Sequence, residues 1–260
     1  MKKGQLVFIP APIIGHFVSA VELAKLLVDR DERLSITVLV METSLSPNIA
    51  RSYIDSVISA WSRIRFVHMP DVELDPSLSG RFFISLIEAQ KSHVKEEVSK
   101  LVLESESGSD SPRLAGFVLD MFFASIIDAV NEFGVPSYIF FTSAASFLGL
   151  TFHIQALHDE QKVDPTEFTN SDVELVVPCL ASPFPVKLSP SSLFSKEWLP
   201  FFFRMIRRAE EIEKGIRGLM EIDREKLKEI SEKSRKALMK DGSSYTCSAR
   251  LIQDIIDNMA

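Results

Sequence analysis

The sequence predicts an α/β protein built on a doubly wound parallel sheet. Short apolar runs rich in β-branched and aromatic residues alternate with amphipathic helical patterns over the first two-thirds of the chain. Strands that alternate with helices favour right-handed crossovers, and these produce a parallel sheet with helices on its faces. The chain has 260 residues, 46% hydrophobic and 25% charged, enough for one large domain or two small ones.

The elements follow one another in a regular order. A strand at 5–9 precedes a helix at 17–30, whose apolar residues recur every three or four positions. The β-rich run 35–40 precedes a helix at 47–60, with Pro47 at a tolerated first-turn position. Further strands are predicted at 64–68, 114–119 and 137–141, and further helices at 81–104, 122–133 and 144–158. Gly134 is well placed to end the helix at 122–133.

The last third of the chain has a different composition. A short final strand is predicted at 173–177, followed by a loop at 178–190 that contains four prolines. Residues 204–240 are charged and helical, and 246–259 form a last amphipathic helix with Leu251, Ile252, Ile255, Ile256 and Met259 on one side. Because the charges of 204–240 mix both signs, a solvated helical face is favoured over a coiled-coil or partner-binding arm.

His16 and Asp120 are the most informative residues. The first apolar run leads to His16, and the run 114–119 leads to Asp120. Ligands bind at the carboxyl ends of the strands in parallel α/β sheets, so these two side chains could meet over one crevice. A carboxylate that orients an imidazole lets it act as a general base near neutral pH. The alternatives are a helix-start histidine without a role and an aspartate that caps the next helix.

Composition and charge exclude several classes of protein. A net charge of −7 gives no indication of a nucleic-acid or anionic-membrane partner. Two distant cysteines, Cys179 and Cys247, form neither a disulfide framework nor a zinc site, and they fit a reducing compartment. The other four histidines have no metal-ligand spacing, so no metal is expected. The apolar segment after Met1 is too short and too broken by prolines for a signal peptide or a membrane span, and we expect a cytoplasmic protein.

Two common α/β sites have no counterpart in the sequence. A dinucleotide-binding turn needs Gly-x-Gly-x-x-Gly after the first strand, but residues 10–15 contain a single glycine. No Gly-x-Ser-x-Gly segment is present for the nucleophile of an α/β-hydrolase.

Three segments resemble those of a known family. They are 10–16 (PAPIIGH), 116–122 (GFVLDMF) and 141–145 (FTSAA), and they are similar to segments of the plant UDP-dependent glycosyltransferases that glycosylate small molecules. The resemblance covers about 4–207, the N-terminal, acceptor-binding half of that family's GT-B fold. Residues 209–260 resemble the family's extreme C-terminus, whose last helix packs back on the N-terminal domain. The resemblance thus implies an acceptor-binding domain at 1–208 and C-terminal helices at 209–260, together one structural unit.

The family's second domain, which binds the nucleotide sugar, has no counterpart here. The resemblance therefore implies an internal deletion near residue 208, engineered or natural. It also implies that UDP-sugar is the family's co-substrate, that no other cofactor takes part, and that this chain alone is inactive. A separate donor domain supplied in trans is the partner expected for it.

The resemblance also assigns roles to residues. It implies that His16 is the base and Asp120 its partner, in transfer to a hydroxyl of a small, largely apolar acceptor such as a phenolic or flavonoid. Acceptor contacts are expected from Ile14, Gly15, Phe82, Leu86, Phe122, Thr142 and Ser143, and Phe83 lies beside them in the sequence. For the aromatic and aliphatic residues the alternative is a plain core position, and for Gly15 it is turn chemistry. For the whole chain the alternative is a non-catalytic small-molecule binding module or scaffold.

Overall fold

A computed structural model of the chain describes residues 3–42, 51–74, 82–106, 111–169, 171–212 and 251–256. The chain divides into two compact units. The first, called the sheet unit below, consists of Met1–Leu78, Phe82–Thr142 and Thr246–Ala260. The second, called the helical unit, consists of Ser79–Arg81 and Ser143–Tyr245. The domain boundaries expected from the sequence stay a prediction.

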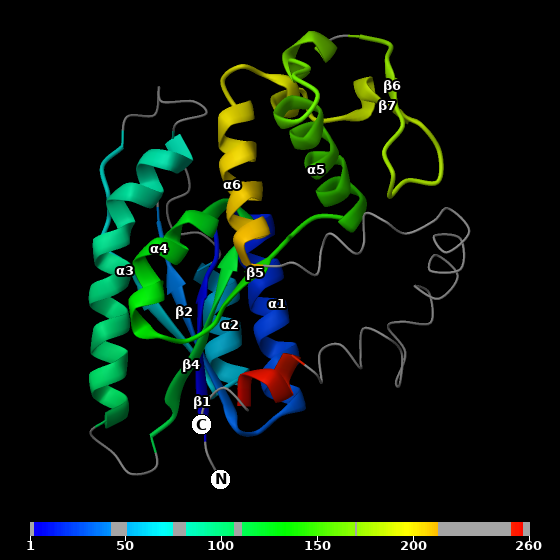
Figure 1. Cartoon of the computed structure of the whole chain (residues 1–260). Helices are drawn as coiled ribbons and strands as arrows, with labels where there is room; N and C mark the ends of the chain where they lie inside the picture. The colour runs from blue at the N-terminus through cyan, green and yellow to red at the C-terminus, as the bar shows by residue number, and fades with distance from the viewer. Residues whose placement is uncertain are drawn as a thin grey trace. The chain divides into compact units, whose positions relative to one another are not determined.

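The sheet unit contains, within its described residues, a five-stranded sheet in the order β3-β2-β1-β4-β5 (Figure 1). Its strands are β1 Gly4–Ile9, β2 Leu34–Val40, β3 Ile64–His68, β4 Arg113–Asp120 and β5 Ser137–Phe140. Every neighbouring pair is parallel. The predicted α/β fold with a parallel sheet is therefore confirmed, and β1 lies at its centre, where both faces are covered.

Two hydrophobic clusters cover the two faces of the sheet. Leu6 and Phe8 of β1 point into a cluster with helices α1 (Ile14–Arg30) and α2 (Arg51–Ala60). Val7 and Ile9, the alternate residues, point into a second cluster with α3 (Phe82–Glu106) and α4 (Ile127–Val130). This alternation follows from the two-residue period of a strand, and it explains why the core strands have almost continuous apolar sequences.

The segment after β4 differs from the prediction. Instead of one helix at 122–133, it forms a 3-10 turn at Met121–Ile126, the single α-turn of α4, and a second 3-10 turn at Asn131–Phe133. The break lies at Phe123, whose φ of −102° and ψ of 15° are not helical. Gly134 ends the segment in the left-handed conformation, with φ of +66°, as predicted.

The first helix begins earlier than predicted, and this changes the position of His16. The first helical hydrogen bond runs from Phe17 N–H to the Ile13 carbonyl, so α1 begins at Ile14 rather than at Phe17. His16 therefore lies in the first turn of α1 and not in the loop before it. Gly15 lies in the same turn, and its φ is not positive, so the interpretation of Gly15 as turn chemistry is wrong.

The C-terminal residues 251–256 are helical and belong to the core of the sheet unit. Ile252 and Ile255 are buried in the same cluster as α1, and Leu251 and Ile256 pack against that cluster. The predicted apolar side of this helix is confirmed at these four positions. Met259 lies outside the described residues.

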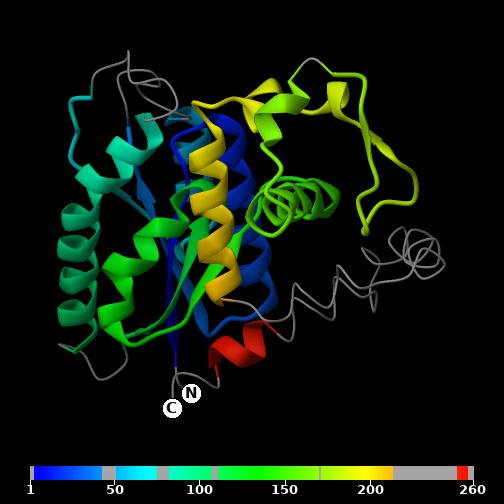
Figure 2. The same cartoon turned by 45° about the horizontal axis from the view of Figure 1, so that its top comes forward.

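The helical unit contains α5 (Ala145–Asp159), α6 (Leu199–Ile212) and a short antiparallel hairpin of β6 (Glu174–Leu175) with β7 (Phe184–Pro185). The predicted strand at 173–177 is thus shorter than expected, and it pairs with a segment predicted as loop. Figure 2 shows α5 almost along its axis, with α6 (yellow) beside it. The ring of His158 in α5 contacts the ring of Phe203 in α6, with 4.8 Å between the ring centroids. Of the predicted charged helix at 204–240, residues 213–240 lie outside the described part of the chain.

Gly149→Ala is expected to destabilise the helical unit, although alanine normally stabilises a helix interior. A Cβ at position 149 would collide with the Cys179 thiol, which packs directly on α5. Overpacking of this kind costs about 1–3 kcal/mol. Urea unfolding, followed by Trp198 fluorescence in a Trp61→Phe background, measures this loss.

Cys179→Gly removes the colliding group and provides the control. In that background Gly149→Ala is expected to stabilise the unit by about 0.5–1 kcal/mol, because only the helix propensity remains. The same loss in both backgrounds would contradict the packing explanation.

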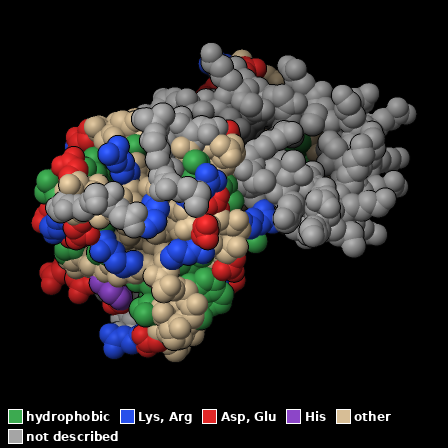
Figure 3. All heavy atoms as spheres, turned by 90° about the horizontal axis from the view of Figure 1, so that it is seen from below, with side chains coloured by type: hydrophobic (Ala, Val, Ile, Leu, Met, Phe, Trp, Pro, Cys, Tyr) green, Lys and Arg blue, Asp and Glu red, His purple; other side chains and the backbone are tan. Residues whose placement is uncertain are grey.

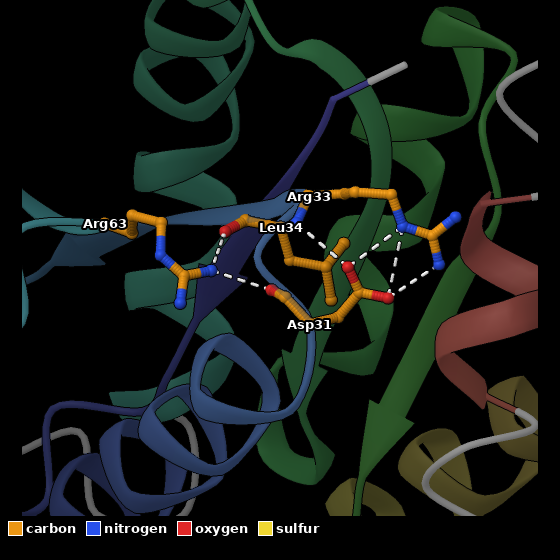
Figure 4. Close-up of polar contacts among 4 residues, drawn as sticks. All are labelled: Asp31, Arg33, Leu34 and Arg63. Carbon is orange, nitrogen blue, oxygen red and sulfur yellow. Dashed lines mark hydrogen bonds and ion pairs between the residues drawn. The ribbon is translucent and has the colours of Figure 1, made fainter. Parts of the chain in front are cut away.

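An arginine and an ion pair fix the connection between α1 and β2 (Figure 4). The guanidinium of Arg63 donates to the Asp31 carbonyl at 2.7 Å, to the Leu34 carbonyl at 2.9 Å, and to the Val28 carbonyl. Arg33 binds the Asp31 carboxylate through Nε at 3.0 Å and Nη2 at 2.6 Å. The guanidinium of Arg63 thus satisfies the Val28 and Asp31 carbonyls at the end of α1, where helical partners are missing.

Asp31→Asn is expected to lower stability at pH 7 by about 1 kcal/mol, with the loss disappearing in acid. Hydrogen bonds from Arg33 hold the pKa of the Asp31 carboxyl below its ordinary value in the folded protein. A lowered folded pKa contributes stability that is complete above the unfolded pKa of about 3.9 and is lost as the pH falls through the folded pKa. Urea midpoints of the two proteins should therefore converge below about pH 4.

Glu104→Gln is the control for this pH dependence. Glu104 pairs with Arg65 on the exposed surface, so its removal should change stability little at any pH. A difference for Asp31→Asn that stayed constant down to pH 2 would show that the ion pair is not its source.

Candidate functional site

The central strands of the sheet bring His16 and Asp120 together. β1 pairs with β4 through Ile9 and Leu119, so the carboxyl ends of the two strands are neighbours. Asp120 is the last residue of β4, and His16 lies in the first turn of the helix that follows β1. His16 Nδ1 and Asp120 Oδ2 are 2.7 Å apart, with the Asp120 side chain fully buried and the His16 side chain 16% exposed. The meeting of these two residues, predicted from the sequence, is present in the structure.

Both carboxylate oxygens of Asp120 have donors. Oδ1 accepts a hydrogen bond from the Phe122 backbone N–H at 2.9 Å, and Oδ2 holds the imidazole. The two roles that the sequence left as alternatives, capping the next segment and orienting the histidine, are thus filled by one side chain. A buried carboxylate is strongly disfavoured unless it is hydrogen-bonded, so this pairing is also what allows Asp120 to be buried.

Thr142 and Phe122 complete the surroundings of the imidazole. Thr142 follows β5, the neighbour of β4, and its Oγ1 lies 2.8 Å from His16 Nδ1. The Phe122 ring stacks on the imidazole with 4.7 Å between centroids and 26° between planes. Sequence reasoning placed both residues near the crevice but missed their contacts with His16. The available signal was that 114–119 and 137–141 are successive strands, whose ends become neighbours in a parallel sheet.

Aromatic side chains extend from this site along the start of α3. Phe83 lies 5.5 Å from Phe122, and Phe82 lies 5.7 Å from Phe83, measured between ring centroids. Phe82 is buried, and Leu86, one turn further, is completely buried in the core beneath. Leu86 thus has the plain core position that the sequence left as its alternative.

The remaining predicted acceptor residues are more exposed. Ile14 is 54% exposed, and a Cβ added at Gly15 would meet no atom within 4 Å. Ser143 is also exposed, but it is the first residue of this stretch that belongs to the helical unit. The structure thus brings together His16, Asp120, Thr142 and Phe122, with Phe83 next to Phe122.

The arrangement suits proton abstraction by His16. An ionised carboxylate only accepts hydrogen bonds, so a neutral imidazole held by Asp120 carries its proton on Nδ1. Nε2 then has the free lone pair that a general base needs. Phe122 and Phe83 add an aromatic surface beside it, of the kind that binds apolar ligands.

The described residues contain no cluster of metal ligands and no helix that could span a bilayer, and the charges on one face are mixed. Among those residues no group of three or more potential metal ligands occurs, and no helix is long and apolar enough to span a bilayer. The described side chains on the face seen in Figure 3 mix basic and acidic groups.

Two hollows of the surface are lined by residues other than His16. One, of about 690 Å³, belongs to the helical unit and includes Asp164 and Trp198. The other, of about 320 Å³, lies at the amino ends of the strands and includes Gln5 and Arg65. Neither contains a predicted site residue.

Comparison with known proteins gives the family. No protein-family model matches the chain. The anthocyanidin 3-O-glucosyltransferase 1 of Manihot esculenta is 49% identical over 204 residues, which are 78% of this chain and 44% of that protein. The UDP-glucose flavonoid 3-O-glucosyltransferase 6 of Fragaria ananassa is 46% identical over 220 residues, which are 83% of this chain and 45% of that protein.

Solved structures agree with these relatives. A UGT transferase from Siraitia grosvenorii in complex with UDP matches with a TM-score of 0.62 and 38% identity over 81% of this chain and 40% of that one. Medicago truncatula UGT71G1 complexed with UDP-glucose matches with a TM-score of 0.66 and 33% identity over 79% of this chain and 43% of that one.

Fold and sequence identity together define an α/β chain that matches part of the solved UGT structures. More particularly, the chain is a homologue of the plant UDP-glycosyltransferases, and the resemblance predicted from its motifs is confirmed. It spans less than half the length of the curated relatives that it matches.

Proposed function

We propose that this chain is the acceptor-binding part of a UDP-sugar-dependent glycosyltransferase that acts on hydroxyls of small molecules such as phenolics and flavonoids. The observation that carries the proposal is the 2.7 Å contact of His16 with the fully buried Asp120, in a homologue of flavonoid glucosyltransferases. The aromatic surface of Phe122 and Phe83 beside the imidazole fits a flat, apolar acceptor.

The proposed reaction uses the free nitrogen of His16. Nε2 takes the proton of the acceptor hydroxyl while that oxygen forms a bond to the anomeric carbon of the sugar. The bond from this carbon to UDP breaks, and UDP leaves with the bonding electrons, so the configuration of the carbon is inverted. Asp120 keeps the imidazole oriented and stabilises the imidazolium that forms.

Catalysis by this chain also requires a site for the UDP-sugar. The chain spans less than half the length of its relatives. The resemblance implies that the family's nucleotide-sugar domain has no counterpart among these 260 residues. Positioning of the sugar and stabilisation of the leaving group are as necessary as the base. We therefore propose that the chain alone binds an acceptor but transfers no sugar, and that a donor-binding part supplied in trans or by fusion restores transfer.

A binding module without catalysis is the second candidate function. It rests on the aromatic surface of Phe122 and Phe83, which can hold a phenol whether or not sugar is transferred. A fusion of this chain to the part of the Fragaria relative that it does not match, called the completed enzyme below, separates the two. If the completed enzyme transfers sugar to the phenol, the result supports an acceptor domain of a glycosyltransferase. If it binds the phenol without sugar transfer, the result supports a binding module.

The first experiment is calorimetric titration of the chain with the flavonol quercetin and, separately, with UDP-glucose. Flavone, which has the same ring system without hydroxyls, is the matched control ligand. We expect quercetin to bind, flavone to bind more weakly, and UDP-glucose not to bind. Tight binding of UDP-glucose would overturn the proposed division of the enzyme, and no binding of quercetin would overturn the acceptor site.

A further inference from the structure

We infer that Thr142 is a positioning residue for His16, which acts with Phe122 to hold the imidazole in one orientation and one plane. The inference rests on the proposed function only for its catalytic consequence, because its structural content concerns the protonation and orientation of one ring. The sequence suggested that Thr142 contacts the acceptor, but its oxygen lies 2.8 Å from Nδ1, the nitrogen that also contacts Asp120.

The number of protons at Nδ1 decides how Thr142 acts. Two oxygens, Asp120 Oδ2 at 2.7 Å and Thr142 Oγ1 at 2.8 Å, approach one nitrogen. If Thr142 donated to Nδ1, that nitrogen would carry a lone pair, and the buried carboxylate oxygen would lose its donor. A buried acceptor without a donor is strongly disfavoured. Thr142 Oγ1 must therefore accept, so that the two oxygens share the single Nδ1–H and the hydroxyl proton of Thr142 points away from the ring.

The shared proton opposes a half-turn of the ring. Such a turn would place a carbon, Cδ2, where Nδ1 meets both oxygens, so it breaks two contacts instead of one. The tautomer itself is set by Asp120, because a threonine hydroxyl can donate to a lone pair on Nδ1 as well as accept from an Nδ1–H. The hydroxyl of Thr142 therefore adds to the orientation of the ring and not to the choice of tautomer.

Phe122 limits the remaining motion of the imidazole. Its ring lies 4.7 Å from the imidazole and nearly parallel to it, which disfavours tilting. Its backbone N–H holds Oδ1 of Asp120, so the same residue orients the carboxylate and the ring that the carboxylate binds. The ring is thus held at one edge by two oxygens and on one face by an aromatic side chain. Nε2 is the nitrogen left for a ligand.

The test uses nitrogen NMR of the full chain labelled with 15N-histidine. Long-range proton–nitrogen spectra report which ring nitrogen carries the proton, and the His16 signals are identified by their loss in His16→Gln. Thr142→Val removes the oxygen while keeping the shape, and Thr142→Ser keeps the oxygen. Thr169→Val, which removes a hydroxyl bonded to the Phe194 carbonyl in the helical unit, is the control for loss of any threonine hydroxyl.

We expect the unaltered chain, Thr142→Ser and Thr169→Val to show His16 protonated on Nδ1. In Thr142→Val the tautomer should stay the same, and the Nδ1 proton should exchange with water about fivefold faster, as expected for the loss of one hydrogen bond that opposes the half-turn of the ring. Unchanged exchange in Thr142→Val would overturn the inference, as would an Nε2–H tautomer in the unaltered chain. If Thr142→Ser behaved like Thr142→Val, the hydroxyl would not be the cause.

Binding measurements separate positioning from acceptor contact. We expect Thr142→Val to change the quercetin affinity less than threefold, because its oxygen serves the imidazole. A tenfold loss of affinity with unchanged exchange of the Nδ1 proton would make Thr142 an acceptor residue and overturn the inference. If the unaltered chain does not bind quercetin, the proposed function fails, and the NMR result still decides the inference.

Discussion

Asp120→Asn is expected to lower the transfer rate of the completed enzyme by about 10²–10⁴-fold. An asparagine fits the same space, but its amide NH2 can donate to Nδ1 of His16, which favours the tautomer with the proton on Nε2. That nitrogen then has no lone pair for the acceptor proton. Steady-state rates with quercetin and UDP-glucose measure the effect, and calorimetry should show quercetin affinity changed little.

His16→Ala is expected to lower the transfer rate at least as much as Asp120→Asn does. The double variant tests whether Asp120 acts through His16. Because Asp120 acts through His16, adding Asp120→Asn to His16→Ala should lower the rate less than threefold further. If the rate loss of the double variant equalled the product of the two single losses, Asp120 would act on the substrate directly. A His16→Ala enzyme that retains more than a tenth of the rate would show that the base lies elsewhere.

The fold was predictable because its signals are local and repeated. The central strands of the sheet have runs of apolar residues with the length of a buried strand, and the helices between the strands have the 3.6-residue period. The same period could not distinguish one helix at 122–133 from successive 3-10 and α turns. The break depends on a hydrogen bond between the Asp120 side chain and the next turn, and on the backbone of Phe123. Neither changes the spacing of apolar residues.

The site was predictable to the extent that strand order implies neighbours. His16 and Asp120 follow runs that become adjacent strands, so their meeting could be expected before the distance was known. The orientation of Thr142 could not be expected in this way, because it depends on which nitrogen of the His16 ring faces the end of β5. The core position of Leu86 could not be predicted either, since an apolar residue at the start of a helix suits both a core and a ligand pocket.

Arg63→Met is expected to destabilise the sheet unit by about 2–4 kcal/mol. Methionine keeps most of the aliphatic length but removes the guanidinium that contacts the carbonyls of Val28, Asp31 and Leu34. These carbonyls belong to the end of α1 and the start of β2, so all three contacts hold the same connection. Figure 4 shows those with Asp31 and Leu34. Hydrogen bonds from a charged donor contribute about 1.5–3 kcal/mol each, and partial exposure of Arg63 reduces their sum.

Urea unfolding monitored by Trp61 in a Trp198→Phe background measures the loss within the sheet unit, since the chain has two tryptophans. Arg65→Met is the matched control, because Arg65 is two residues away and forms an exposed pair with Glu104. Its removal should cost less than about 0.5 kcal/mol. Arg63→Lys should lie between the two, since a lysine keeps the charge but cannot reach three carbonyls with a planar fork. Equal losses for Arg63→Met and Arg65→Met would mean that the positive charge, and not the carbonyl contacts, stabilises this connection.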